Sequence, residues 1–146
     1  MPKPLPSEIE LPRAADDDLG VTAFLEAFGE ALTAGKAEAI ADMWDLPGYM
    51  LGADMAEALE ERGELLAVFA GARENYNARG VMNTRPDIVR LDEINPRLVC
   101  VRVRWPWLDG EDREVGAEVS TYTLRKDDSG DWKLRVALMH GVEAVN

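Results

Sequence analysis

The chain has 146 residues, of which 47% are hydrophobic, and this length and composition predict one compact folded domain. Its 28 acidic residues outnumber 16 basic ones and give a net charge of -12, which opposes contact with a polyanion, so no nucleic-acid partner is expected. With one cysteine and one histidine, neither an internal disulfide nor a His/Cys zinc site is expected, and no motif points to another metal or a cofactor.

The N-terminal residues do not have the pattern of a signal peptide. Prolines at positions 2, 4, 6 and 12 and three aspartates at residues 16–18 predict an extended or disordered lead-in over residues 1–17. A single domain is then expected over residues 18–146. No window approaches the roughly 18 consecutive apolar residues that a membrane span needs, so we expect a cytoplasmic protein without membrane contact.

The first half of the domain shows helical spacing. Apolar residues from Val21 to Leu32 recur every three or four positions, and Gly35 follows where a helix would end. A second, shorter helix is expected over residues 36–45, because three apolar side chains share one face before a Leu-Pro-Gly sequence breaks the pattern. A third helix is expected over residues 64–80, with a glycine at its end.

The segment between the second and third helices is ambiguous. Residues 49–53 have the character of a short strand. Residues 54–62 have helical propensity, but they also suit a second short strand. Both assignments stay open from the sequence.

The second half of the domain changes to strand character. Four β-rich runs, at residues 86–94, 97–107, 114–126 and 131–141, are separated by turn sequences such as Asp109-Gly110. Consecutive strands with short connections favour an antiparallel meander. Three helices before such a sheet predict an α+β fold in which the helices cover one sheet face.

The alternation of side chains along a strand predicts which residues face the helices. In the second run, Val99, Val101, Val103 and Trp105 share the inward side. In the last run, the same rule places His140 in line with the apolar residues from Trp132 to Leu138. We therefore expect His140 to be largely buried, at or near the wall of a cavity.

Three stretches of the chain resemble a known superfamily in their order, spacing and character. They are FLEAFGEALTAGKAEAIADMW, LEERGELLAVF and WKLRVALMHG, and the superfamily is that of nuclear transport factor 2 (NTF2-like), in particular its small bacterial SnoaL-like and ketosteroid-isomerase-like members. The resemblance implies a cone-shaped, cystatin-like fold with three N-terminal helices packed on a curved antiparallel sheet. Because this scaffold serves isomerases, dehydratases, cyclases and assembly domains, the resemblance leaves the function open.

The catalytic groups of ketosteroid isomerases do not carry over to this chain. Phe28 stands where that enzyme type has a tyrosine that stabilises an oxyanion, and ungapped alignment places Gly52 at its general base. The neighbourhood of its second acid reads Val-Ser-Thr at residues 119–121. Without an acceptor and a strong donor, that activity is not expected unless a shift of two residues brings Asp54 into the pocket.

Candidate functional residues follow from their chemistry and from the expected cavity. Histidine is the side chain best suited to proton transfer at neutral pH, so His140 with Asp54 or another carboxylate is a candidate for that role. The structural alternatives are a buried histidine with one hydrogen-bond partner and a turn-forming aspartate. The wall of the pocket is expected to be apolar and aromatic. Its expected residues are Phe28, Trp44, Tyr49, Tyr76, Trp105 and His140.

The sequence thus predicts an NTF2-like domain with a pocket for a small apolar or aromatic molecule. One alternative is a pocket enzyme of isomerase, dehydratase or cyclase type that uses His140 with a carboxylate. Another is a non-catalytic dimerisation or assembly module, since members of the superfamily commonly pair through the outer sheet face. Parity places Arg102, Arg104 and Arg135 on that face with Tyr122 and Met139, and we expect a homodimer through it.

Overall fold

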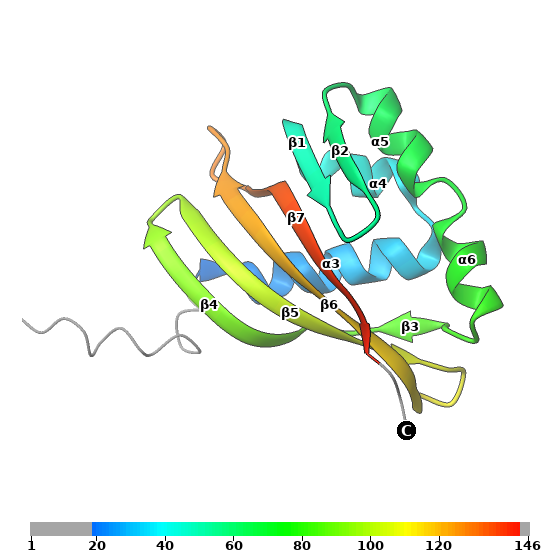
Figure 1. The fold of residues 1–146 in the computed structure, drawn as a ribbon. Coiled ribbons are helices and arrows are strands. Elements are labelled where there is room, and N and C mark those ends of the chain that lie inside the picture. Colours follow the sequence, from blue (N-terminus) through cyan, green and yellow to red (C-terminus); the bar gives the residue numbers. More distant parts are fainter. Residues whose placement is uncertain (1–18, 144–146) are drawn as a thin grey trace, which may run out of the picture.

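The computed structural model describes residues 19–143, so the expected lead-in at residues 1–17 lies outside the described part of the chain. Helices lie in the first half of the described chain and the longest strands follow, which confirms the α+β class, but two strands interrupt the expected run of N-terminal helices (Figure 1). The described elements, in chain order, are α3 (Val21–Ala34), α4 (Ala37–Asp42), β1 (Trp44–Leu51), β2 (Ala56–Leu59), α5 (Arg62–Phe69), α6 (Ala72–Ala78), β3 (Asn83–Thr84), β4 (Asp87–Asn95), β5 (Leu98–Leu108), β6 (Glu114–Lys126) and β7 (Trp132–Glu143).

The helix pair α3 and α4 forms the hairpin expected at the start of the domain. The apolar stripe of α3, which includes Leu25 and Phe28, is buried in the core. Gly35 ends α3 in the left-handed conformation with φ of 72°, and the backbone N–H of Lys36 donates to the carbonyl of Ala31. None of the helices within residues 19–143 has the length and apolar character needed to cross a membrane.

The expected third helix is two separate helices. α5 begins with a capping box, in which the side chains of Glu61 and Glu64 each accept the backbone N–H of the other residue. Ala70 is extended and Gly71 has a φ of 79°, so the chain turns before α6 begins. The prediction of one helix was wrong because apolar spacing continues across Gly71, whose missing side chain permits the positive φ.

The sheet is mixed and not purely antiparallel. Its strand order is β2-β1-β7-β6-β5-β3, and β4 also pairs with β5. β1 pairs antiparallel with β2 and parallel with β7. The antiparallel prediction failed at this pairing because rules for consecutive strands say nothing about strands so far apart in the chain. The structure assigns a strand, β2, within the ambiguous segment.

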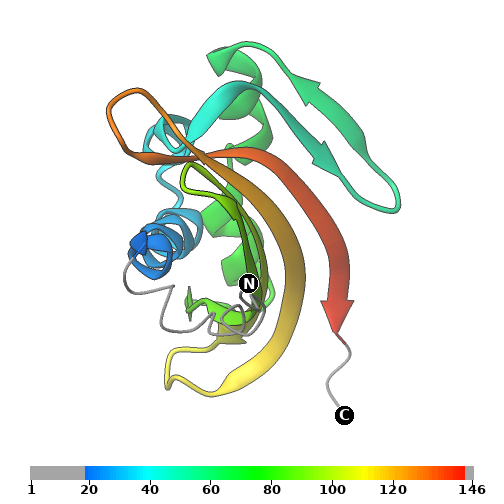
Figure 2. The ribbon, with the colours of Figure 1, turned by 90° about the vertical axis from the view of Figure 1, so that its left-hand side faces the viewer.

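The sheet curves around α3, as the end-on view in Figure 2 shows. Val99, Val101, Val103 and Trp105 of β5 are buried on the inner face, as expected from parity. Antiparallel pairing places a residue of β6 opposite each of them, so these β6 residues share the inner face. In the same order they are Leu124, Tyr122, Ser120 and Glu118.

The last strand, β7, follows the predicted alternation only in its first part. Trp132 and Leu134 are buried in the core as expected. The register with β6 then shifts, because Leu134 and Val136 pair with consecutive residues of β6 and Arg135 is left as an extra residue. Such a bulge reverses the face on which the next side chains lie, as far as a second register shift at His140, which has no partner on β6 between Met139 and Gly141.

The bulge corrects the predicted orientation of the later residues of β7. Ala137 is 4% exposed, whereas Leu138 is 40% exposed. Met139 packs against the core, and His140 is exposed. The predicted burial of His140 in line with Leu138 is therefore wrong, because Arg135 is an extra residue before Leu138 and His140 is itself the extra residue of the second register shift.

Candidate functional site

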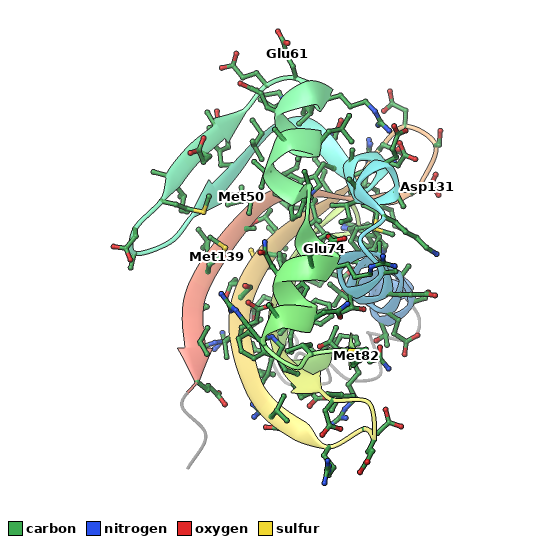
Figure 3. All side chains as sticks on the ribbon, turned by 90° about the vertical axis from the view of Figure 1, so that its right-hand side faces the viewer. Met50, Glu61, Glu74, Met82, Asp131 and Met139 are labelled. Carbon is green, nitrogen blue, oxygen red and sulfur yellow. The ribbon has the colours of Figure 1, made fainter. Side chains whose placement is uncertain are left out.

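An inner cavity of about 90 Å³ lies between the helices and the inner face of the sheet. Of the residues expected in a pocket, it is lined by Phe28, Trp44 and Tyr76. Two methionines, Met50 on β1 and Met139 on β7, also line it and are labelled in Figure 3. The other lining residues are Leu32, Phe69, Glu118, Ser120, Tyr122 and Ala137.

An aromatic cluster supports the wall of the inner cavity. The Trp105 indole N–H donates to the Tyr122 hydroxyl at 2.8 Å, and Phe28 meets Tyr122 edge-on with 5.9 Å between ring centroids. Burial raises the pKa of Tyr122 above its usual range, and the Glu118 carboxylate adds to that rise. Trp105, expected as a pocket residue, is 2% exposed and does not line the inner cavity. It contributes to the site through its hydrogen bond to Tyr122.

Glu118 is the acidic residue of the cavity wall. It lies on β6 opposite Trp105, and its Oε2 accepts a hydrogen bond of 3.0 Å from the Tyr76 hydroxyl of α6. Burial raises the pKa of Tyr76 well above its usual range, and the charge of Glu118 raises it further. Tyr76 therefore keeps its proton and donates to one carboxylate oxygen, and among residues 19–143 no donor contacts the other oxygen of Glu118.

Two further hollows adjoin the inner cavity, because each shares lining residues with it. The helix cleft, of about 210 Å³, lies beside α5 and α6 and shares Tyr76 and Glu118 with the cavity. The edge hollow, of about 330 Å³, lies between the β1–β2 turn and the strands β6 and β7, and shares Glu118, Ser120 and Met139. Glu118 thus lines all three spaces.

The two residues predicted for proton transfer, His140 and Asp54, both line the edge hollow with Glu118. Both side chains are exposed, and His140 Nε2 lies 2.7 Å from Thr121 Oγ1. Within residues 19–143, no hydrogen bond joins His140 to a carboxylate, and no group of three or more His, Cys, Asp or Glu side chains could hold a metal ion. The structure brings His140 and Asp54 to one hollow without pairing them.

Tyr49 lies outside the inner cavity, on the outer sheet face. The register of β1 with β7 pairs Met50 with the buried Ala137, so Met50 faces inward and Tyr49, which is 44% exposed, faces outward. Tyr49 lines a shallow outer hollow with Arg125 and Arg135. The expected place of Tyr49 in the inner pocket wall is therefore corrected.

The outer sheet face also carries apolar residues other than the expected ones. Tyr122, expected there, faces the core. Exposed apolar side chains are instead contributed by β1 and β7, where Leu51 pairs with Leu138. We call this group the outer apolar patch; it consists of Tyr49, Leu51, Val136 and Leu138.

Glu118 is the functional candidate that reasoning from the sequence missed. The run at residues 114–126 has apolar residues at both odd and even positions, so its inward side is ambiguous. Tyr122 and Leu124 show the correct side, and Glu118 shares their parity. The available signal was an acidic residue in line with two large apolar ones.

Solved structures of similar fold share little sequence with the chain. An NTF2-like protein of unknown function from Shewanella oneidensis is 16% identical with a TM-score of 0.63, over 85% of this chain and 98% of that one. A protein of unknown function with a cystatin-like fold from Nostoc punctiforme is 19% identical with a TM-score of 0.67, over 88% and 92%. A ketosteroid isomerase-like protein from Erwinia carotovora is 17% identical with a TM-score of 0.63, over 88% and 99%.

These likenesses show a shared cystatin-like fold and nothing about activity. A search of curated proteins found no match to the chain. The sequence profile of one family, described as NTF2-like protein (DUF6841), matches residues 16–142. That match spans most of the chain and agrees with helices packed in a curved sheet, so the chain belongs to the NTF2-like family.

Proposed function

We propose that this protein binds a small, largely apolar molecule in the inner cavity and anchors it through Glu118. The observation that carries the proposal is that Glu118 lines the inner cavity, the helix cleft and the edge hollow. An apolar wall with a few convergent polar groups is the usual form of a small-molecule site. A ligand entering by either hollow therefore meets the same carboxylate.

The size of the inner cavity limits how the ligand sits. Its volume of about 90 Å³ is smaller than the roughly 150 Å³ of an engineered cavity that holds benzene. A ligand therefore places a small group in the inner cavity and the rest in the helix cleft or the edge hollow. Met50 and Met139 line the cavity, and their flexible side chains can adapt to such a group.

The charge of the site selects against acids. A ligand carboxylate would face Glu118 in a partly desolvated space, within a chain whose net charge is -12. A neutral donor, such as a hydroxyl or an amide N–H, or a cationic amine can instead donate to the free oxygen of Glu118. The ligand class is thus neutral or cationic.

A thermal-shift experiment with matched compounds tests this function. Benzylamine and benzoate have similar size and opposite charge, so benzylamine should raise the melting temperature and benzoate should not. Glu118→Gln should remove most of the benzylamine effect. Glu26→Gln is the control, because Glu26 is exposed on α3 and lines none of the three spaces. Equal stabilisation by the two compounds would contradict the proposal.

A second candidate function is proton transfer in the edge hollow. The observation that favours it is that His140, Asp54 and Glu118 line the same space. In this hypothesis Glu118 or Asp54 accepts a proton from a bound ligand and His140 relays it. A stabilising compound with a C–H next to a carbonyl should then exchange that hydrogen for deuterium from heavy water in the wild type, with the exchange lost in His140→Gln, as followed by NMR of the compound.

A further proposal concerns assembly: the outer apolar patch pairs two copies of the chain. Leu51 and Leu138 are neighbours on adjacent strands, and both are at least 40% exposed. Contiguous apolar area of this kind on a sheet face suits an interface with a second copy. This pairing leaves the inner cavity on the opposite face of the sheet free for a ligand.

A further inference from the structure

The four tryptophans of the chain differ in whether their indole N–H has a hydrogen-bond partner. Trp105 donates to the Tyr122 hydroxyl, and Trp132 donates to the carbonyl oxygen of Leu19 at 2.7 Å. Among residues 19–143, the N–H groups of Trp44 and Trp107 are buried and have no partner. Burial of an unpaired donor is costly, so each of these two N–H groups needs an explanation.

The surroundings of the two unpaired tryptophans differ. Trp107 packs under Arg79 and edge-on to Tyr76, and it lines none of the three spaces. Trp44 is 6% exposed and lines the inner cavity. The edge of its ring that carries Cε3 and Cζ3 lies against Gly48, and in an indole the N–H lies on the opposite edge.

A second donor of the inner cavity is the Tyr122 hydroxyl. Its oxygen already accepts the Trp105 N–H. Burial raises the pKa of Tyr122 more than its hydrogen bond with the Ser120 side chain lowers it, and the nearby Glu118 charge adds to the rise, so the hydroxyl keeps its own proton. A hydroxyl whose oxygen accepts one hydrogen bond becomes a better donor through its proton. The inner cavity therefore combines two donors, on Trp44 and Tyr122, with one carboxylate, on Glu118.

We infer that the ligand of the inner cavity carries an uncharged oxygen acceptor, such as a carbonyl oxygen, that accepts the Trp44 N–H and the Tyr122 O–H. This inference rests on the proposed function and adds the chemistry of the buried end of the ligand. Two N–H or O–H donors can both hydrogen-bond to one carbonyl oxygen. The negative charge of Glu118 repels a negatively charged acceptor, so an uncharged oxygen is favoured. Small ketones, esters and amides are the class that fits.

The test uses acetophenone and ethylbenzene, which are similar in size and differ in the carbonyl oxygen. The indole N–H signals of the ¹⁵N-labelled full chain report each tryptophan directly, and single Trp→Phe variants assign them. Acetophenone should move the Trp44 signal downfield in a saturable manner, as a new hydrogen bond requires, while ethylbenzene should not. The Trp107 signal should stay in place with both compounds.

Affinity measurements complete the test. Trp44→Phe keeps the ring but removes the donor, so its affinity for acetophenone should fall about fivefold to tenfold, the usual effect of one lost hydrogen bond. Trp107→Phe, the matched control, should bind as the wild type does. Should Trp44→Phe not fold, the downfield shift in the wild type still decides the matter.

The outcomes separate this inference from the proposed function. Equal affinity for acetophenone and ethylbenzene, with the same small effect of both on the Trp44 signal, would overturn the acceptor inference and leave cavity binding in place. A preference for acetophenone that survives in Trp44→Phe would also overturn the role of Trp44. If neither compound binds and benzylamine fails as well, the proposed function falls together with this inference.

Discussion

The inner and outer faces of the strands β5, β6 and β7 are built from alternate residues of the same sequence, yet they differ in composition. The inner face is mostly apolar and aromatic, with Ser120 and Glu118 as polar residues at the inner cavity, and the outer face carries charged side chains such as Arg102 beside the outer apolar patch. On each face, the exceptions are the residues that folding alone does not require. A carboxylate on the inner face points to a ligand, and exposed leucines on the outer face point to a partner.

The largest difference between the faces should appear on truncation of a side chain of β5. Trp105→Ala removes a buried indole and its hydrogen bond to Tyr122, and should lower the free energy of unfolding by about 3–5 kcal/mol. Arg102→Ala, on the opposite face of the same strand, should change it by less than about 0.5 kcal/mol. Urea unfolding of the two variants checks this; similar losses would mean that the faces are not distinct in packing.

A smaller difference in stability is expected between alanine substitutions at a buried and at an open glycine. A Cβ added to Gly29 of α3 would lie 2.7 Å from Trp105 Cζ3, so Gly29→Ala should cost about 1–3 kcal/mol through overpacking. Gly63 of α5 has open space around it, and Gly63→Ala should stabilise by up to about 1 kcal/mol because alanine favours the helix. Thermal unfolding of both variants gives the comparison, and a stabilised Gly29→Ala variant would show a loosely packed core.

The sequence predicted the parts of the fold that depend on local periodicity. The first helix was readable because its apolar residues keep one face, and β5 was readable because Val99 to Trp105 alternate without interruption. The parallel pairing of β1 with β7 was not readable, because it joins segments far apart in the chain. The break at Gly71 was hidden by apolar residues that continue the spacing on both sides.

The candidate site was less predictable than the fold for two specific reasons. Two extra residues in β7, Arg135 and His140, interrupt the alternation of side chains. The prediction therefore placed His140 inside and Met139 outside, the reverse of the structure. In β6, apolar residues occur at both odd and even positions, so the sequence did not show that Glu118 faces inward on the same side as Tyr122. Phe28, Trp44 and Tyr76, which helix spacing or core character singled out in the sequence, line the inner cavity, and their part in ligand binding stays a prediction.

The outer apolar patch gives a third prediction, on assembly. Light scattering should report about twice the 16.1 kDa mass of the chain. Leu138→Glu places a charge in the patch and should weaken self-association at least about tenfold, a change of about 1.4 kcal/mol. Met82→Glu, at an exposed apolar residue outside the patch, is the control. If light scattering reports a monomeric wild type even at high protein concentration, the outer apolar patch is not a dimer interface.

The smallest expected effect is on alkaline stability. The pKa of Tyr122 is raised in the folded state, so above about pH 10 the unfolded chain loses this proton first and the free energy of unfolding falls as the pH rises. Below that pH Tyr122 is protonated in both the folded and the unfolded chain, so its contribution to the free energy of unfolding does not change with pH. Unfolding measured between about pH 9 and pH 11 should therefore show a shallower decline for Tyr122→Phe than for the wild type.

A decline for Tyr122→Phe that is as steep as that of the wild type would contradict the buried, protonated state of the Tyr122 hydroxyl.

A crystal structure of the full chain with benzylamine bound tests the central claim, anchoring by Glu118, most directly. The amine nitrogen should lie about 3 Å from the carboxylate of Glu118, with the ring in the helix cleft or the edge hollow and the Tyr76 hydrogen bond retained. Benzylamine bound on the outer face, or bound inside without contact to Glu118, would contradict it.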